Sequence, residues 1–441
     1  MTMNRLSANS TKISYKTGSG DSATFKELEF LMEVPEFGGA PEKVDVTVLS
    51  DAVKSIWPES AFPYLRSLLT DGVIAGVGGL LVFLPNILLL FMAIAFLEGT
   101  GYMARAAFVM DGFMHMFGLH GKSFIPMLLG FGCSVPAIMA TRTIESERDR
   151  LTTIMIIPFM SCGARLPIYS LIIPAFFAVR YQALMMWIMY VIGVVVALCC
   201  ALLLKSTLFR GEGEVFVMEL PPYRMPTLRS ILIQMWERAV MYLHKAGTLI
   251  LGASVILFII NTFPEKTDFG ATGEKLAAVE QSTTLPAAEK EAAIAELNGE
   301  IKAQKLEYST AGRLGRALSV VLSPIGFDWK VSSALIGAFA AKEVFVAQLG
   351  VLFSIEDAEA SADSLQMRLR QAYTPLQAFC IMLFCLLTIP CMATVAIVRR
   401  ETNSWKLTFF QMGMYTVVAY GLTFIAYRIG LLLGIGTTFL S

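Results

Sequence analysis

Long apolar runs that are interrupted by glycine and proline constrain this chain more than any other feature of its sequence. The clearest interruptions are GFGCSVPAIMATR (130–142) and SCGARLPIY (161–169), and each places a cysteine beside glycine and proline. Irregular backbone at membrane depth is tolerated only where it is buried in protein or lines a cavity. A thiol at such a break is a ligand for a soft or borderline metal ion. The two segments therefore predict a membrane transporter with a metal path through it.

The composition also indicates a membrane protein. Hydrophobic residues make up 55% of the 441 residues and charged residues only 16%, whereas soluble domains carry about 25% charged residues. The net charge of zero argues against nucleic acid as a partner. The seven cysteines lie in apolar stretches, which does not suit a secreted disulfide framework. We predict an all-α fold, a polytopic integral membrane helical bundle with broken or re-entrant helices.

The distribution of charge and hydropathy divides the chain into six predicted parts. They are a polar arm without a G domain (1–67), a first membrane half (68–204), a cytoplasmic amphipathic connector (205–237), a transmembrane helix (238–263), an external charged helical insert (264–325) and a second membrane half (326–441). The arm has no long apolar run, so we expect a flexible segment with a short amphipathic piece.

The basic loops predict the orientation, because Lys and Arg concentrate on the cytoplasmic side of a membrane protein. These loops hold Arg142, Arg148, Arg150, Lys205, Arg210, Arg224, Arg229, Arg399, Arg400 and Lys406. With all of them inside, the segment 331–354 must enter and return on the outer side. A re-entrant hairpin near Glu343 is the consequence.

One spacing suggests an internal repeat. Cys133 precedes Arg142 by nine residues and Cys391 precedes Arg400 by nine, and each arginine ends an apolar run. Many transporters consist of paired repeats with broken helices at matching positions. The alternative is a chance match between two apolar segments of similar length.

Three thiols are candidates for the metal path. Cys133 sits in a Gly-x-Gly-Cys-x-x-Pro break, where freed carbonyls and a thiol share one space, and Cys162 and Cys391 sit in similar breaks. The backbone residues that define these breaks are Gly130, Gly132, Pro136, Gly163, Pro167 and Pro390. The simpler alternative is a helix kink with a small residue at a packing contact. A second break so soon after the first favours a function.

Two acids and one arginine in apolar surroundings are further candidates, because ionisable groups inside a membrane are costly. Glu343 lies beside Lys342 in an apolar stretch and is predicted near the path, the alternative being an internal ion pair. Glu98 ends an apolar run, and its alternative is an interfacial acid in water. Arg165 is predicted to cap the C-terminus of a half-helix rather than to pair with an acid.

Hydrolase and nucleotide-binding motifs are missing from the sequence. The tripeptide GKS at 121–123 lacks the glycine five residues before Gly121 that a phosphate loop requires, since Met116 stands there. HExxH and GxSxG do not occur either. We therefore predict no catalytic residues, no nucleotide-binding site and no GTPase activity of the chain's own.

Several ordered blocks carry a family resemblance. The chain resembles the membrane portion of the FeoB family of bacterial ferrous iron transporters over about 68–435, apart from a 264–312 insert, through blocks such as EGTGYMARAAFVMD, GFGCSVPAIMATRTIESERDRL, PFMSCGARLPIY, ELPPYRMP, AAKEVFVAQLGVL and PCMATVAIVRRE. The resemblance implies two gate repeats, also termed nucleoside-recognition repeats, one around Cys133 and Cys162 and one around Lys342 and Glu343. It further implies a multi-pass protein of the bacterial cytoplasmic membrane that passes Fe²⁺, with Glu98, Glu343 and Cys391 near the path.

The resemblance also sets expectations for cofactors and partners. Fe²⁺ would be the transported ion, and no cofactor would be bound permanently. The family carries an N-terminal G domain that this chain does not show, so GTP would act only through a separate G-domain protein. A small SH3-like FeoA-type protein, membrane lipid and a second copy in a homo-oligomer are the other expected partners.

Two alternatives to an iron permease stay open on the sequence. A gate-type permease for another metal or for a nucleoside-like solute would keep the fold but change the solute. A non-transporting membrane scaffold or regulatory subunit of a split transporter would tolerate loss of the gate thiols, whereas a permease would not.

Overall fold

The computed structural model describes most of the chain outside its N-terminal part. Secondary structure is described for residues 2–7, 10–17, 24–31, 68–69, 75–209, 223–242, 247–264, 287–353 and 362–434, and at residues 272, 275 and 279. The chain divides into two units, Met1–Pro85 and Asn86–Ser441.

Three short strands form a sheet in the first unit. They are β1 (Thr2–Ser7), β2 (Ser10–Thr17) and β3 (Thr24–Leu31), paired antiparallel in the order β1-β2-β3. In the register of β2 and β3, Ile13 pairs with Leu28 and Thr11 with Phe30, and β-branched and aromatic residues favour strands. The prediction of a flexible arm is wrong for these residues, because strands this short leave only a weak alternating pattern.

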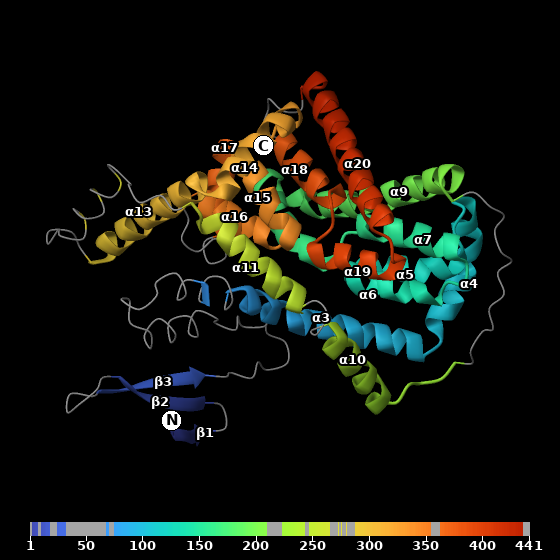
Figure 1. Ribbon diagram of the computed structural model, residues 1–441, viewed down its shortest axis with the longest axis horizontal. Helices are drawn as coiled ribbons and strands as arrows, with labels where there is room; N and C mark the ends of the chain where they lie inside the picture. The colour runs from blue at the N-terminus through green and yellow to red at the C-terminus, as the bar shows by residue number, and fades with distance from the viewer. Residues whose placement is uncertain are drawn as a thin grey trace. The chain divides into compact units, whose positions relative to one another are not determined.

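From Ala75 onward, the residues that the structure describes form only helices, turns and irregular segments, as the predicted all-α fold requires. Its unbroken helices are α3 (Ala75–Gly99), α4 (Tyr102–Met116), α9 (Val179–Thr207), α10 (Leu228–Tyr242), α11 (Thr248–Thr262), α13 (Ala287–Tyr308), α14 (Thr310–Leu322), α17 (Ala362–Ala372) and α20 (Trp405–Leu432) (Figure 1). Among the described residues, four segments are long and apolar enough to cross a membrane, and a fifth is obtained if the bent pair α3 and α4 counts as one.

The predicted breaks divide four segments into paired half-helices. The pairs are α5 (Phe124–Gly130) with α6 (Ser134–Ala140), α7 (Glu147–Ile156) with α8 (Leu166–Phe176), α15 (Trp329–Ala340) with α16 (Val344–Leu352), and α18 (Pro375–Leu387) with α19 (Met392–Thr402). Short 3-10 turns at Ile157–Phe159 and Gly163–Arg165 flank the second break. The prediction of broken helices is therefore confirmed.

The order of these elements shows the two repeats. Each repeat runs through two broken pairs into one long helix, α9 in the first and α20 in the second. The packing follows the same symmetry, because α8 contacts α16 while α6 contacts α19, as Figure 1 shows. This order matches Cys133 with Glu343 and Cys162 with Cys391. The nine-residue spacing in the sequence is therefore not the repeat relation, since Arg142 lies in the 3-10 turn after α6 whereas Arg400 lies within α19.

One predicted boundary differs from the structure, and another falls partly on residues outside the described part of the chain. Of the single helix expected at 238–263, the structure describes α10 as far as Tyr242 and α11 from Thr248, and residues 243–246 lie outside the described residues. The last part of the predicted external insert is α14, which packs on α15 so closely that a Cβ at Gly315 would lie 2.7 Å from the Ser333 Cβ. Residues 310–322 therefore belong with the second membrane half.

Helix α20 fixes the end of α7, the half-helix that leads to the second break. The Tyr415 hydroxyl donates to the Met155 carbonyl at 2.6 Å, and the Gln411 amide donates to the Ile154 carbonyl at 3.2 Å. The Tyr415 ring also packs edge-on against Phe159 at 4.6 Å between ring centroids. All these side chains are buried. Helix α20 of the second repeat therefore fixes the position of the second break, which belongs to the first repeat.

Candidate functional site

The four breaks place four predicted site residues in equivalent positions. Cys133 is the N-cap of α6, Cys391 is the N-cap of α19, and Glu343 is the N-cap of α16. Cys162 is the N-cap of the 3-10 turn that continues into α8. Each candidate ligand therefore stands where the chain leaves an irregular segment and re-enters a helix, as in discontinuous transporter helices.

The first two breaks touch through their backbones. The Gly163 N–H donates to the Gly132 carbonyl at 3.1 Å, which links the break of Cys133 to the break of Cys162. A Cβ at Gly132 would overlap the terminal methyl groups of Leu90 of α3, and a Cβ at Gly130 would lie 3.1 Å from the Met160 Cβ. The first break therefore packs closely against its neighbours at these two glycines.

The predicted prolines start the second half-helices. Pro136 and Pro167 lie in the first turns of α6 and α8, and Pro390 directly precedes Cys391 at the start of α19. A proline in the first turn of a helix costs little, because the N–H it lacks would have no partner within the helix. These residues consequently end the irregular segments without bending the helices that follow.

The three predicted thiols and Glu343 come together. The Cys133 thiol interacts electrostatically with the thiols of Cys162 and Cys391 and with the Glu343 carboxyl. Cys391 also interacts with Cys162 and Glu343. The three thiols differ from the other cysteines in exposure: Cys133, Cys162 and Cys391 are half-buried, Cys199 is exposed, and Cys200, Cys380 and Cys385 are buried. The structure therefore gathers the residues that the breaks predict into one group, which we call the thiol cluster (Cys133, Cys162, Cys391 and Glu343).

The thiol cluster is open. Within the part of the chain that the structure describes, no three His, Cys, Asp or Glu side chains lie close enough to hold a metal ion together. The hydroxyl of Thr394, a residue that the sequence pattern does not single out, lies 3.2 Å from the Cys391 sulfur. Such an arrangement offers an ion successive contacts, which suits conduction better than storage.

Arg165 caps the end of a half-helix, as predicted. Its guanidinium donates to the Met160 carbonyl at 2.7 Å and to the Pro158 carbonyl at 2.9 Å, and its side chain is 2% exposed. Lys342 is 3% exposed and interacts electrostatically with Arg165. The ion pair considered for Lys342 with Glu343 is not found among the described residues. Two buried cations therefore stand beside the thiol cluster.

Glu98 does not join the thiol cluster. It lies at the end of α3, and its carboxylate forms an ion pair with Arg238 of α10 at 2.5 Å. The Glu98 side chain is 55% exposed, which fits the interfacial alternative better than a place on the path. The expectation for Glu98 fails because a residue 140 positions away supplies its partner.

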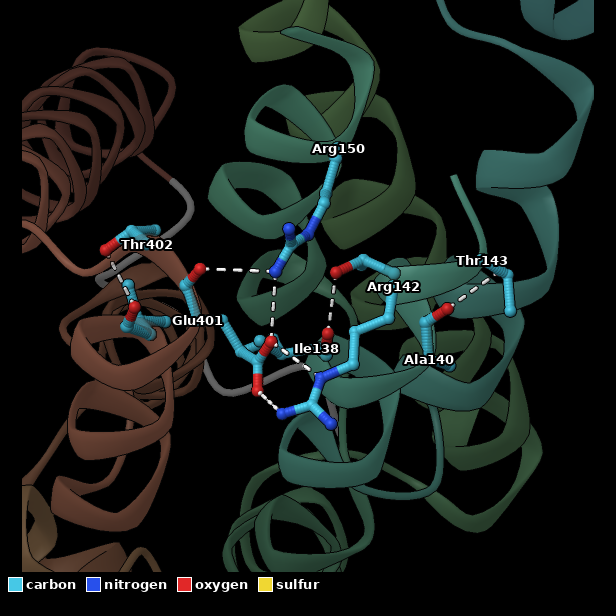
Figure 2. A network of polar contacts seen from close by, with 9 residues as sticks. Ile138, Ala140, Arg142, Thr143, Arg150, Glu401 and Thr402 are labelled. Carbon is cyan, nitrogen blue, oxygen red and sulfur yellow. Dashed lines mark hydrogen bonds and ion pairs between the residues drawn. The ribbon is translucent and has the colours of Figure 1, made fainter. Parts of the chain in front are cut away.

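Glu401, which the sequence pattern does not identify, is the centre of a polar network at the far end of α19. Its carboxylate accepts hydrogen bonds from Arg142 and Arg150, as Figure 2 shows. The neighbouring carboxylate raises the pKa of Arg142, so this guanidinium stays charged. The only sequence signal was an acid directly after two arginines in a loop that is otherwise basic.

Comparisons with known proteins agree with this arrangement. The family model Gate, described as nucleoside recognition, matches residues 80–176 and 243–405, together more than half of the chain. The model described as Ferrous iron transport protein B C terminus matches residues 186–238. We found no solved structure that matches the chain.

Curated relatives share much of the sequence. The chain is 43% identical over 394 residues to the Fe(2+) transport protein A/Fe(2+) transporter FeoB fusion protein of Porphyromonas gingivalis, covering 87% of the chain and 46% of the relative. It is 41% identical over 395 residues to the Fe(2+) transporter FeoB of Helicobacter pylori, covering 88% and 61%. For the Fe(2+) transporter FeoB of Staphylococcus aureus the identity is 40% over 383 residues, covering 86% and 52%. The chain thus spans about half the length of the curated relatives it matches.

Proposed function

The chain belongs to the Gate family, whose model is described as nucleoside recognition, and we propose that it forms the Fe²⁺ path of a FeoB-type transporter. Its apolar helices make it a multi-pass membrane protein, and its relatives are named Fe(2+) transporters, which supports a place in the cytoplasmic membrane. The observation that carries the proposal is the thiol cluster, where three half-buried thiols and one carboxyl meet at four helix breaks.

The chemistry of the thiol cluster suits a borderline divalent ion. Thiols bind the softer transition metals, and a carboxylate adds a hard ligand that Fe²⁺ also accepts. Because the described residues form no closed site of three ligands, the ion exchanges partners as it moves and is not trapped. Thiols suit Zn²⁺ and Cu(I) as well, so the choice of iron rests on the relatives that are named Fe(2+) transporters.

The path is formed by both repeats. Cys133 and Cys162 belong to the first repeat, while Glu343 and Cys391 belong to the second. An ion at the thiol cluster therefore touches both halves, and a small rotation of one half against the other changes which ligands reach it. Alternating exposure of a shared site is the mode of transport that follows.

The proposal predicts that Cys133→Ser lowers Fe²⁺ uptake into sealed proteoliposomes under anaerobic, reducing conditions. Serine keeps the size of the side chain but removes the thiol. We expect the initial rate to fall about ten-fold or more, since even the outer partners of metal ligands are worth that much. Cys162→Ser is expected to behave alike, because both thiols belong to one cluster.

Cys199→Ser is the matched control. Cys199 lies on α9 with an exposed side chain and outside the thiol cluster, so its replacement should leave the rate unchanged. Equal rates for all three variants would contradict a thiol-lined path. Uptake that appears only after a separate G-domain protein and GTP are added would support the path and assign the energy source to that partner. No uptake under either condition would favour a scaffold.

Partners are also proposed. No nucleotide-binding motif occurs within these 441 residues, so we propose that any use of GTP depends on a G domain outside them. One relative is a fusion of Fe(2+) transport protein A with FeoB, and a fused domain in one organism is often a separate subunit in another. This favours a FeoA-type partner for the chain.

A further inference from the structure

Glu401 holds two arginines with an almost fully buried carboxylate. Its Oε1 accepts from Arg142 Nη2 at 2.5 Å, and its Oε2 accepts from Arg142 Nε at 2.9 Å and from Arg150 Nη2 at 3.0 Å. The Glu401 side chain is 3% exposed. Figure 2 shows the two guanidinium groups converging on this carboxylate from the first repeat. We call Glu401, Arg142 and Arg150 the Glu401 clamp.

The clamp lies at the opposite ends of the helices that carry the thiols. Glu401 is in the last turn of α19, which begins at Cys391. Arg142 follows α6, which begins at Cys133. Arg150 is in α7, and the chain runs from the end of α7 into the break of Cys162. One carboxylate thus ties together three helical segments, each with a gate thiol at its other end.

The helices between clamp and thiols are short and well packed. At about 1.5 Å per residue, α6 and α19 reach only about 10 and 16 Å. Their facing side chains belong to one buried cluster, which includes Ile138 from α6, Ile397 from α19 and Ile154 from α7. The thiols of Cys133 and Cys391 pack against this cluster. Because packed helices move as rigid bodies, a shift at the clamp is carried to the thiols.

We propose that Glu401 is a positioning residue that sets the spacing of the gate thiols, and that opening of its clamp lets α19 move against α6 and α7. The bidentate contact with Arg142 gives the clamp a defined geometry. Without the Glu401 carboxylate, Arg142 loses both of its contacts there and Arg150 keeps only the backbone carbonyl of residue 401, so the two like charges repel and the segments are no longer tied together. The importance of the spacing for iron rests on the proposed function, but the spacing itself can be measured without iron.

The test uses the chain with only Cys133 and Cys391 retained and the other five cysteines replaced by alanine. The rate at which the shortest bifunctional thiosulfonate cross-links the two thiols is measured in this chain with Glu401 in place and in its Glu401→Gln variant. The glutamine keeps the size of the side chain but removes its charge. We expect the rate to fall about ten-fold, because the effective concentration of one thiol at the other falls as α19 loosens. In the chain that keeps all its cysteines, the Glu401→Gln substitution is expected to lower Fe²⁺ uptake as well.

Glu145→Gln is the matched control. Glu145 also forms an ion pair, with Lys122 at 2.8 Å, but its side chain is 79% exposed and it lies outside both α6 and α19. It should leave cross-linking unchanged. Arg150→Gln, which spares the pair with Arg142, should give an intermediate rate and keeps the test decisive if Glu401→Gln fails to fold. A wild-type cross-linking rate in folded Glu401→Gln would overturn the inference. If Glu401→Gln slows cross-linking but the unsubstituted chain takes up no iron, the positioning role of Glu401 is supported and only the proposed function is contradicted.

Discussion

Replacing Arg165 with methionine is expected to destabilise the protein and to abolish Fe²⁺ uptake. The guanidinium is the partner of the carbonyls of Pro158 and Met160, both in the segment that leads to Cys162. Without it two buried carbonyls lose their donors, at about 1–3 kcal/mol each, so the free energy of unfolding should fall by about 2–6 kcal/mol. The backbone beside Cys162 would also lose its fixed shape, on which the proposed ion path depends.

The measurement is detergent-induced unfolding combined with uptake into proteoliposomes. Arg165→Lys keeps the charge but cannot reach both carbonyls in a fork, so it should give an intermediate loss of stability. Arg180→Met is the matched control, because Arg180 is exposed at the start of α9, and its effect should stay within about 0.5 kcal/mol. Wild-type stability of Arg165→Met would refute the capping role.

Replacing Gly193 with alanine is expected to be the most damaging single-methyl change in α9. A Cβ at Gly193 would lie 2.7 Å from the carbonyl oxygen of Phe159, the last residue before the second break. Phe159 is fully buried and cannot yield without moving the Cys162 segment. Overpacking of this kind costs about 1–3 kcal/mol, and the displaced break should lower iron uptake as well.

Gly421→Ala is the matched comparison, because here the added methyl group is expected not to lower the stability. Gly421 lies in α20, and a Cβ there would meet nothing within 4 Å. Alanine favours the helix over glycine by up to about 1 kcal/mol, so this variant should be neutral or stabilised. If Gly193→Ala were stabilised to the same extent in an unfolding titration, the close contact between α9 and the second break would not exist in the protein.

The breaks could be predicted from the sequence because their chemistry is local. Glycine and proline interrupt a helix wherever they stand, and the cysteines lie within three residues of them. The cysteine caps of α6, of the 3-10 turn before α8 and of α19 therefore follow from the printed sequence. The role of Arg165 was predictable for the same reason, since its carbonyl partners lie 5 and 7 residues away.

Partnerships across the chain could not be predicted in this way. Glu401 meets Arg142 across 259 positions, and Glu98 meets Arg238 across 140. Such pairs depend on which helices pack together, and a single sequence contains no record of that packing. The repeat relation was assigned to the wrong residues for the same reason, because the spacing of Cys133 and Arg142 describes one helix and not its place in the fold.

The lining of the thiol cluster has a consequence for the discrimination of hard cations. Mg²⁺ needs about six oxygen ligands in octahedral geometry and gives up water reluctantly. The cluster offers one carboxylate, that of Glu343, and otherwise sulfur. Helix N-termini add positive charge at each break, and Arg165 and Lys342 stand buried beside them. A hydrated hard cation therefore finds few side-chain oxygens to replace its water, whereas a softer ion finds three thiols. On the proposed iron path, exclusion would thus come from a shortage of side-chain oxygen, and selectivity would not require the wanted ion to be held tightly.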